Sequence, residues 1–210
     1  MFSWRNFTAL NTRTFKQRVI ETVTAEVENY KRTFIDYEYL IVSKSFVQRP
    51  YYILSGTENN YLHLTGIQTS LSPQAFFAKC ITNTLMESDI NLENKQNKGT
   101  VRKKINVLGN LNELFEKELL FEEDFSKNTV QCALAAVDNT FTIGYSSGPK
   151  GYPKTLLKGN ELNNIVLIDF ILKRKKGSHL FNSLVKGNIV PDQLTDEVKT
   201  LIDSRILTSA

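Results

Sequence analysis

Residues 129–145, TVQCALAAVDNTFTIGY, decide the expected fold of this chain. β-Branched and apolar residues dominate Thr129–Asp138 and Thr140–Tyr145, and Asp138-Asn139 is a short polar break of the type that joins hairpin strands. The sequence then shows two more strand patterns, Lys154–Leu157 and Ile165–Lys173. The C-terminal half therefore predicts a series of antiparallel strands.

The N-terminal part of the chain adds a helix and two further strands. Apolar residues at three- and four-residue steps predict a helix over 12–33, with Thr12 or Thr14 as its N-cap. Strands are expected at Tyr37–Ser43 and Pro50–Gly56, because both segments are rich in aromatic and β-branched residues.

More helices are expected in the middle of the chain and at its C-terminal end. Ser72 and Pro73 fit an N-cap and a first helical position, whereas the polar residues 87–100 are expected to form an exposed loop. Arg102-Lys103-Lys104 leads into a leucine-rich helix or two short helices, and 177–210 is expected to be a helical C-terminal extension. This order predicts an α+β fold with helices packed on an antiparallel β-sheet.

Composition is that of an ordinary globular protein. Lys and Arg outnumber Asp and Glu by 26 to 22, an excess compatible with a polyanionic partner but too small to identify one. Cys80 and Cys132 lie far apart without CxxC or Cys/His spacing, so neither a metal site nor a cofactor is expected. Because signal-peptide and membrane-span patterns are lacking, we expect a soluble, cytoplasmic protein without membrane contact.

The octapeptide Asn60–Ile67, NYLHLTGI, contains His63, one of two histidines in the chain. It directly follows a predicted strand, so His63 is expected in a loop or at the end of an element, where functional side chains are often presented. Histidine is the side chain best suited to proton transfer near neutral pH. The alternative is a hydrogen-bonded histidine within the core.

Cationic, hydroxyl and aromatic side chains elsewhere are suited to complete a site for metal-free RNA cleavage. That reaction needs a base for the ribose 2′-OH, an acid for the 5′-oxygen and donors that stabilise the charged phosphate. Tyr61 and Tyr145 are suited to stack on a nucleobase. The remaining candidates are Thr65, Lys79, Lys103, Thr142, Ser146, Lys154 and Lys158.

Several of these residues also have a purely structural explanation. Thr142 and Tyr145 suit a strand as β-branched and aromatic residues, and Lys79 can extend its stem past the apolar face of its helix. Asp169 lies in an apolar strand and is expected to need a partner, for which Lys154 and His63 are the candidates.

Six short motifs occur in order along the chain, namely Asn60–Gly66, Ser72–Lys79, Arg102–Leu114, Phe141–Gly144, Pro153–Leu156 and Ile168–Ile171. Together they resemble the phage-associated barnase–EndoU–colicin–RelE-like nucleases, in particular the small domains numbered fourth in that group. The resemblance covers about residues 12–176, the expected nuclease domain, and leaves 177–210 as an extension. Lys154 departs from the pattern, because arginine is common at its position and has the planar fork that suits phosphate.

The resemblance implies an α+β fold and a metal-independent endoribonuclease that cleaves by 2′-OH attack and leaves a 2′,3′-cyclic phosphate. It also implies a role as a toxin or as a phage-defence or mobile-element effector. Matched residue by residue, it favours His63 as general acid/base and Lys154 and Lys79 as phosphate stabilisers. It further favours Thr142 as a hydroxyl donor to phosphate or an orienter of His63.

RNA is the expected substrate, and an antitoxin, protein or RNA, is an expected partner because an unregulated cellular ribonuclease would be toxic. Two other function classes stay open. One is a non-catalytic module that binds nucleic acid or protein, and the other is a phage or mobile-element accessory protein that binds its partner through its sheet and tail helices. A cleft that holds His63, Lys154 and Thr142 favours the nuclease, whereas a His63 sealed under Leu62 and Leu64 favours the binding module.

Overall fold

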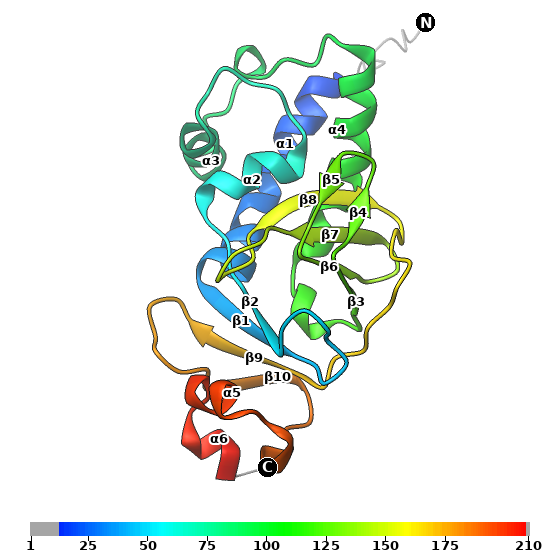
Figure 1. Ribbon diagram of the computed structural model, residues 1–210. Coiled ribbons are helices and arrows are strands. Elements are labelled where there is room, and N and C mark those ends of the chain that lie inside the picture. The colour runs from blue at the N-terminus through cyan, green and yellow to red at the C-terminus, as the bar shows by residue number, and fades with distance from the viewer. Residues whose placement is uncertain (1–12, 209–210) are drawn as a thin grey trace, which may run out of the picture.

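The computed structural model describes residues 13–208 and shows an α+β fold (Figure 1). Helices α1 to α4 form a layer at one end of the molecule, above two four-stranded antiparallel sheets, and short C-terminal helices lie at the opposite end. The fold class expected from the sequence is thereby confirmed.

Helix α1, Phe15–Tyr30, begins at Thr14, whose hydroxyl accepts a hydrogen bond from the Gln17 amide while the Gln17 side chain accepts one from the Thr14 amide. This reciprocal pair satisfies donors that a helix start leaves unpaired. The buried face repeats at the expected spacing and consists of Val19, Val23, Val27 and Tyr30. The helix continues as a π-helical turn, Lys31–Ile35, and the alternative N-cap Thr12 lies outside the described residues.

The first sheet has the strand order β10-β9-β1-β2, with all neighbours antiparallel. Its central pair joins residues far apart in sequence, because Tyr37 lies opposite Lys175 and Val42 opposite Phe170. The strands are β1 Tyr37–Val42, β2 Tyr51–Leu54, β9 Phe170–Lys175 and β10 Ser183–Gly187.

The second sheet has the order β3-β6-β7-β8, so β8 is an edge strand. The expected hairpin is present: the Asp138 carboxylate accepts hydrogen bonds from the Thr140 and Phe141 amides, and Asn139 takes a left-handed φ of 77°. The strands are β3 Leu120–Glu123, β6 Leu134–Val137, β7 Phe141–Tyr145 and β8 Pro153–Lys158, with a separate small pair β4 Ser126–Lys127 and β5 Val130–Gln131.

Three further helices pack near α1, namely α2 Glu58–Thr65, α3 Pro73–Ile81 and α4 Lys95–Leu108. Ser72 is the N-cap of α3, as expected, and its hydroxyl accepts from the Ala75 amide. The loop expected over 87–100 is wrong from Lys95 onward, because Asn94 caps a helix there by accepting from two backbone amides. A short 3₁₀ turn, Glu87–Asp89, precedes α4, and two more follow it at Gly109–Leu111 and Leu114–Glu116.

The C-terminal extension contains a strand as well as helices. β10 adds to the edge of β9, and the chain ends in the 3₁₀ turn Pro191–Gln193 and the helices α5, Asp196–Leu201, and α6, Ser204–Thr208. This segment covers the face of the first sheet that points away from the main core (Figure 1). The residues buried there are Leu40, Val42, Phe170, Leu172, Phe181, Ile189, Val198 and Ile202.

Candidate functional site

A pocket of about 470 Å³ lies where helix α2 meets the edge strand β8. Two of its side chains come from α2 and the others from β8 and the loop that precedes it. Its lining contains an imidazole, an ammonium group, two hydroxyl groups and an amide, and no carboxylate. The lining residues are Asn60, His63, Ser146, Tyr152, Pro153 and Lys154.

His63 lies in the last turn of α2 and is exposed to solvent. Its helix begins at Thr57, whose amide and hydroxyl both donate to the Asn60 side-chain oxygen, and ends at Gly66 with a left-handed φ of 69°. Asn60 and His63 are three residues apart and therefore share one helix face. The expectation that His63 ends an element is met, and His63 is not sealed under its leucine neighbours.

Lys154 enters the pocket from an irregularity in β8. Gly144 of β7 pairs with Thr155 and the next residue, Tyr145, pairs with Pro153, so Lys154 is the extra residue of a β-bulge. Bulges redirect side chains and are frequent beside active sites. Lys154 is exposed, and its ammonium donates to the Gln131 carbonyl at 2.8 Å, which leaves two N–H groups for a ligand.

The loop from Ser146 to Tyr152 forms the wall of the pocket opposite α2. It closes on itself, because the Ser146 amide donates to the Tyr152 carbonyl at 2.9 Å and the Tyr152 amide donates to the Ser146 hydroxyl at 3.1 Å. Gly151 is hydrogen bonded to the other sheet through the Ile53 carbonyl and the Ser55 amide. The two sheets therefore hold this wall between them.

Glu38 anchors the same loop from beneath. Its carboxylate is 2% exposed and pairs with both the Lys150 ammonium of the loop and the Arg174 guanidinium of β9. Burial by itself raises the pKa of Glu38, but the hydrogen bonds from Lys150 and Arg174 outweigh it and hold this pKa below its ordinary value. Glu38 is therefore charged at neutral pH and fixes the loop.

Lys104 reaches the site from helix α4, and its ammonium donates to the backbone carbonyl of His63 at 2.8 Å. Burial lowers the pKa of Lys104 to about 8. The sequence indicated a basic run at 102–104, but no pattern along the chain singled out this lysine, because its partner lies on another helix.

Thr142 does not line the pocket. It is buried in β7, and its hydroxyl donates to the Gly159 carbonyl at 2.9 Å and accepts from the Glu161 amide at 3.0 Å. A hydroxyl engaged in this way holds the 159–161 turn, so the expected contact with phosphate or with His63 does not fit its position.

The aromatic residues expected to stack on RNA are also buried. Tyr61 is fully buried and donates to the Val23 carbonyl. Tyr145 is also fully buried, and its hydroxyl has no partner in the described part of the chain. Thr65 is buried too, and its hydroxyl donates to the Leu62 carbonyl at the end of α2. Tyr152, which sequence reasoning missed, is the aromatic residue that lines the pocket.

Lys79 lies apart from the pocket, on helix α3. Its ammonium forms an ion pair with both carboxylate oxygens of Asp89, at 3.0 and 2.9 Å, and this pairing keeps the pKa of Asp89 below its usual value. A lysine neutralised by its own carboxylate does not fit the expected role at phosphate. By contrast, Lys103 on α4 and Lys158 on β8 are exposed, and these two elements contact each other, although neither lysine lines the pocket.

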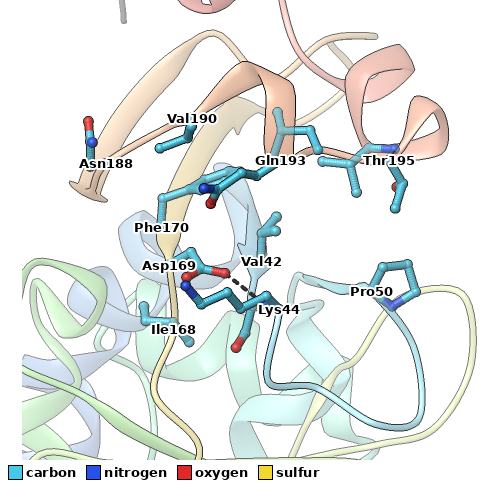
Figure 2. Close-up of a pocket in the computed structure, with 13 residues that line it drawn as sticks. Val42, Lys44, Pro50, Ile168, Asp169, Phe170, Asn188, Val190, Gln193 and Thr195 are labelled. Carbon is cyan, nitrogen blue, oxygen red and sulfur yellow. Dashed lines mark hydrogen bonds between the residues drawn. The ribbon is translucent and has the colours of Figure 1, made fainter.

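A second pocket, of about 340 Å³, lies between the first sheet and the C-terminal extension (Figure 2). Here the Asp169 carboxylate accepts a hydrogen bond from the Lys44 amide at 2.6 Å. The prediction that Lys154 or His63 is its partner is therefore wrong. The rest of the lining mixes apolar side chains such as Val42 and Phe170 with polar ones such as Asn188 and Gln193. The negative charge of Asp169 would repel a phosphate placed close to it.

Within residues 13–208, no helix is long and apolar enough to span a bilayer. The same range contains no group of three or more His, Cys, Asp or Glu side chains placed to hold a metal ion.

The fold and the pocket between α2 and β8 define an α+β protein that presents an imidazole and an ammonium group at one sheet edge. The chain belongs to the family described as phage-Barnase-EndoU-ColicinE5/D-RelE like nuclease4. The family model matches residues 26–178, which are well over half of the chain. The resemblance found in the sequence is thereby confirmed, and membership in a nuclease family implies a nucleic-acid substrate. Comparison with curated proteins and with solved structures gave no match.

Proposed function

We propose that this protein is a metal-independent endoribonuclease whose active site is the pocket between α2 and β8. The observation that carries the proposal is that His63 and Lys154, 91 positions apart in the numbering, line one pocket that has no carboxylate. An imidazole and an ammonium group in such a pocket suit a phosphodiester, because a nearby carboxylate would repel its negative charge.

In the proposed reaction, His63 acts as general acid/base. It takes the proton from the ribose 2′-OH as the 2′-oxygen bonds to phosphorus, and it returns a proton to the 5′-oxygen as the phosphorus–oxygen bond breaks. The products are a 2′,3′-cyclic phosphate and a free 5′-hydroxyl. Lys154 stabilises the charge that accumulates on the phosphate with the two N–H groups that its contact to Gln131 leaves over.

The other lining residues hold the substrate. The Ser146 hydroxyl and the Asn60 amide nitrogen are placed to donate to phosphate or sugar, and Tyr152 replaces the buried tyrosines as the residue that stacks on a base. Lys158 and Lys103, both exposed, extend the positive charge to neighbouring phosphates.

The test is cleavage of a mixed RNA pool in EDTA by wild type, His63→Ala and His179→Ala. His179 is the second histidine and lies exposed in the bend before β10, so its variant controls for loss of an imidazole in general. We expect wild type and His179→Ala to leave 2′,3′-cyclic ends and His63→Ala to lose at least 100-fold in rate. RNA binding without cleavage by the wild type would instead support the non-catalytic module.

In the cell, we propose that the activity serves a toxin, phage-defence or mobile-element function in the cytoplasm, with an antitoxin as neutralising partner. Support comes from the phage-type nuclease family alone. Induced expression of wild type and His63→Ala tests it: growth arrest by the wild type only is expected, and equal growth of both strains would contradict it.

A further inference from the structure

The C-terminal end of α2 is held by a side chain from a different helix. The last carbonyls of any helix lack partners within the helix, and cations satisfy them well because this end carries partial negative charge. In α2, the Leu62 carbonyl accepts from the Thr65 hydroxyl and the His63 carbonyl accepts from the Lys104 ammonium. His63 is thus hydrogen bonded through its backbone carbonyl to Lys104 of α4.

Gly66 leaves room for this contact. A Cβ atom at Gly66 would lie 2.9 Å from Cδ and 3.4 Å from Cε of Lys104, so the lysine stem passes directly over the glycine. The left-handed φ of Gly66 also favours glycine. The Thr-Gly that follows His63 in the sequence therefore both ends α2 and admits the lysine.

We propose that Lys104 is a positioning residue of the nuclease site: by holding the His63 carbonyl, its ammonium fixes the end of α2 and thereby the imidazole in the pocket. This inference rests on the proposed function. Within residues 13–208 Lys104 has no carboxylate partner, so its charge is balanced by no ion pair. Partial burial of a cation is unfavourable in free energy, and an apolar side chain at this position would avoid that penalty. Among residues 13–208, the one hydrogen bond of the Lys104 side chain is to the backbone of His63.

The kinetic test compares Lys104→Met, Lys104→Arg and Lys98→Met. Methionine retains most of the stem and loses the donor, arginine retains a cationic donor, and Lys98 is an exposed lysine of the same helix that is remote from the pocket lining. For Lys104→Met we expect kcat to fall about 10- to 100-fold with KM within about twofold, because a misplaced catalytic group slows chemistry without removing a substrate contact. Lys104→Arg should recover at least a third of the lost rate, and Lys98→Met should equal wild type.

A spectroscopic test is independent of turnover. In a His179→Gln background, His63 gives the single histidine ring signal, and Lys104→Met should shift or broaden it whereas Lys98→Met should not. An unchanged ring signal in Lys104→Met, or a kcat within twofold of wild type, overturns the proposal. A loss confined to KM also overturns it, because Lys104 would then bind RNA directly. If wild type does not cleave RNA, the proposed function fails, while the ring signal still decides whether Lys104 positions His63.

Discussion

The Glu38 carboxylate of β1 and the Lys150 ammonium of the pocket loop form an ion pair that joins the first sheet to the wall of the candidate site. Arg174 of β9 donates to the second carboxylate oxygen, with Nε at 2.8 Å. The loop also contains Ser146 and leads into Lys154. The geometry of the site therefore depends on the buried Glu38 carboxylate.

Replacing Glu38 with Gln is expected to destabilise the protein, because it leaves two cations without their shared carboxylate. We expect a loss of about 1–3 kcal/mol, since Lys150 is partly exposed and water screens its charge. Chemical denaturation of wild type and Glu38→Gln measures this difference. A loss below about 0.5 kcal/mol would mean that the loop is held by its backbone bonds alone.

The same pair predicts a dependence of stability on pH. The folded-state pKa of Glu38 is lowered, so its stabilisation is complete above the unfolded-state pKa of about 4.3 and is lost as pH falls through the folded-state value. The gap in unfolding free energy between wild type and Glu38→Gln should therefore be constant above about pH 5 and shrink in more acidic solution. A gap that stays constant in acid would contradict this assignment.

Lys104 predicts a rise of stability with pH as well, but in an alkaline window. Its folded-state pKa of about 8 lies below the unfolded value of about 10.4, so the folded protein binds fewer protons between these limits. Stability should rise with pH across that window by up to about 3 kcal/mol in wild type relative to Lys104→Met. Thermal unfolding of both proteins from pH 7 to 10.5 measures this change. If the unfolding free energies of the two proteins vary with pH in the same way, the pKa of Lys104 is not lowered by folding.

Lys154→Met and Lys79→Met form a matched pair that tests which lysine serves the phosphate. Lys154 lines the pocket with His63, whereas Lys79 is engaged by Asp89. We expect Lys154→Met to lower kcat/KM about 100-fold, the scale of removing one charged stabiliser of a transition state, and Lys79→Met to stay within twofold. Steady-state cleavage of one RNA oligonucleotide by both variants measures these losses. A larger loss of kcat/KM in Lys79→Met than in Lys154→Met would place the site at α3 instead.

Phe181→Ala tests whether the C-terminal extension folds together with the nuclease domain. Phe181 is fully buried against the first sheet, and the Arg174 guanidinium lies 4.2 Å from its ring centre. Removing the ring should cost about 3–5 kcal/mol in a single cooperative transition. Two separate unfolding transitions would show instead that the extension is an independent unit.

Much of this fold follows from local patterns in the sequence. The Val-rich stripe predicts α1, Ser72-Pro73 predicts the start of α3, and Asp138-Asn139 predicts the β6–β7 hairpin. The second half of α4 lies in the helix expected from Arg102 onward, but its first turns were assigned to a loop because they are polar and contain Gly99 and show no clear apolar period before Val101. β10 was missed because its pairing with β9, rather than its own sequence, makes it a strand.

The site was predicted only in part, because the direction of several side chains depends on how the strands pair, which the local sequence does not determine. His63 and Lys154 share a pocket as expected, but the inward or outward direction of Thr142 and Tyr145 depends on how β7 pairs, and all five residues of β7 are buried. The bulge at Lys154 and the loop that exposes Tyr152 arise from pairing between strands. Lys104 depends on the packing of α4 beside α2, which no local pattern encodes.

Because β8 is an edge strand, Lys154 and Lys158 also bear on self-association of the protein. An unpaired strand edge is a template on which another chain can add a strand, and proteins guard such edges with lysines and bulges. β8 has both, so the cations proposed to attract RNA are also of the kind that protects a strand edge from self-association. Neutralising both lysines to abolish catalysis would therefore remove a safeguard against self-association, and a catalytically dead form for cellular work is better made at His63.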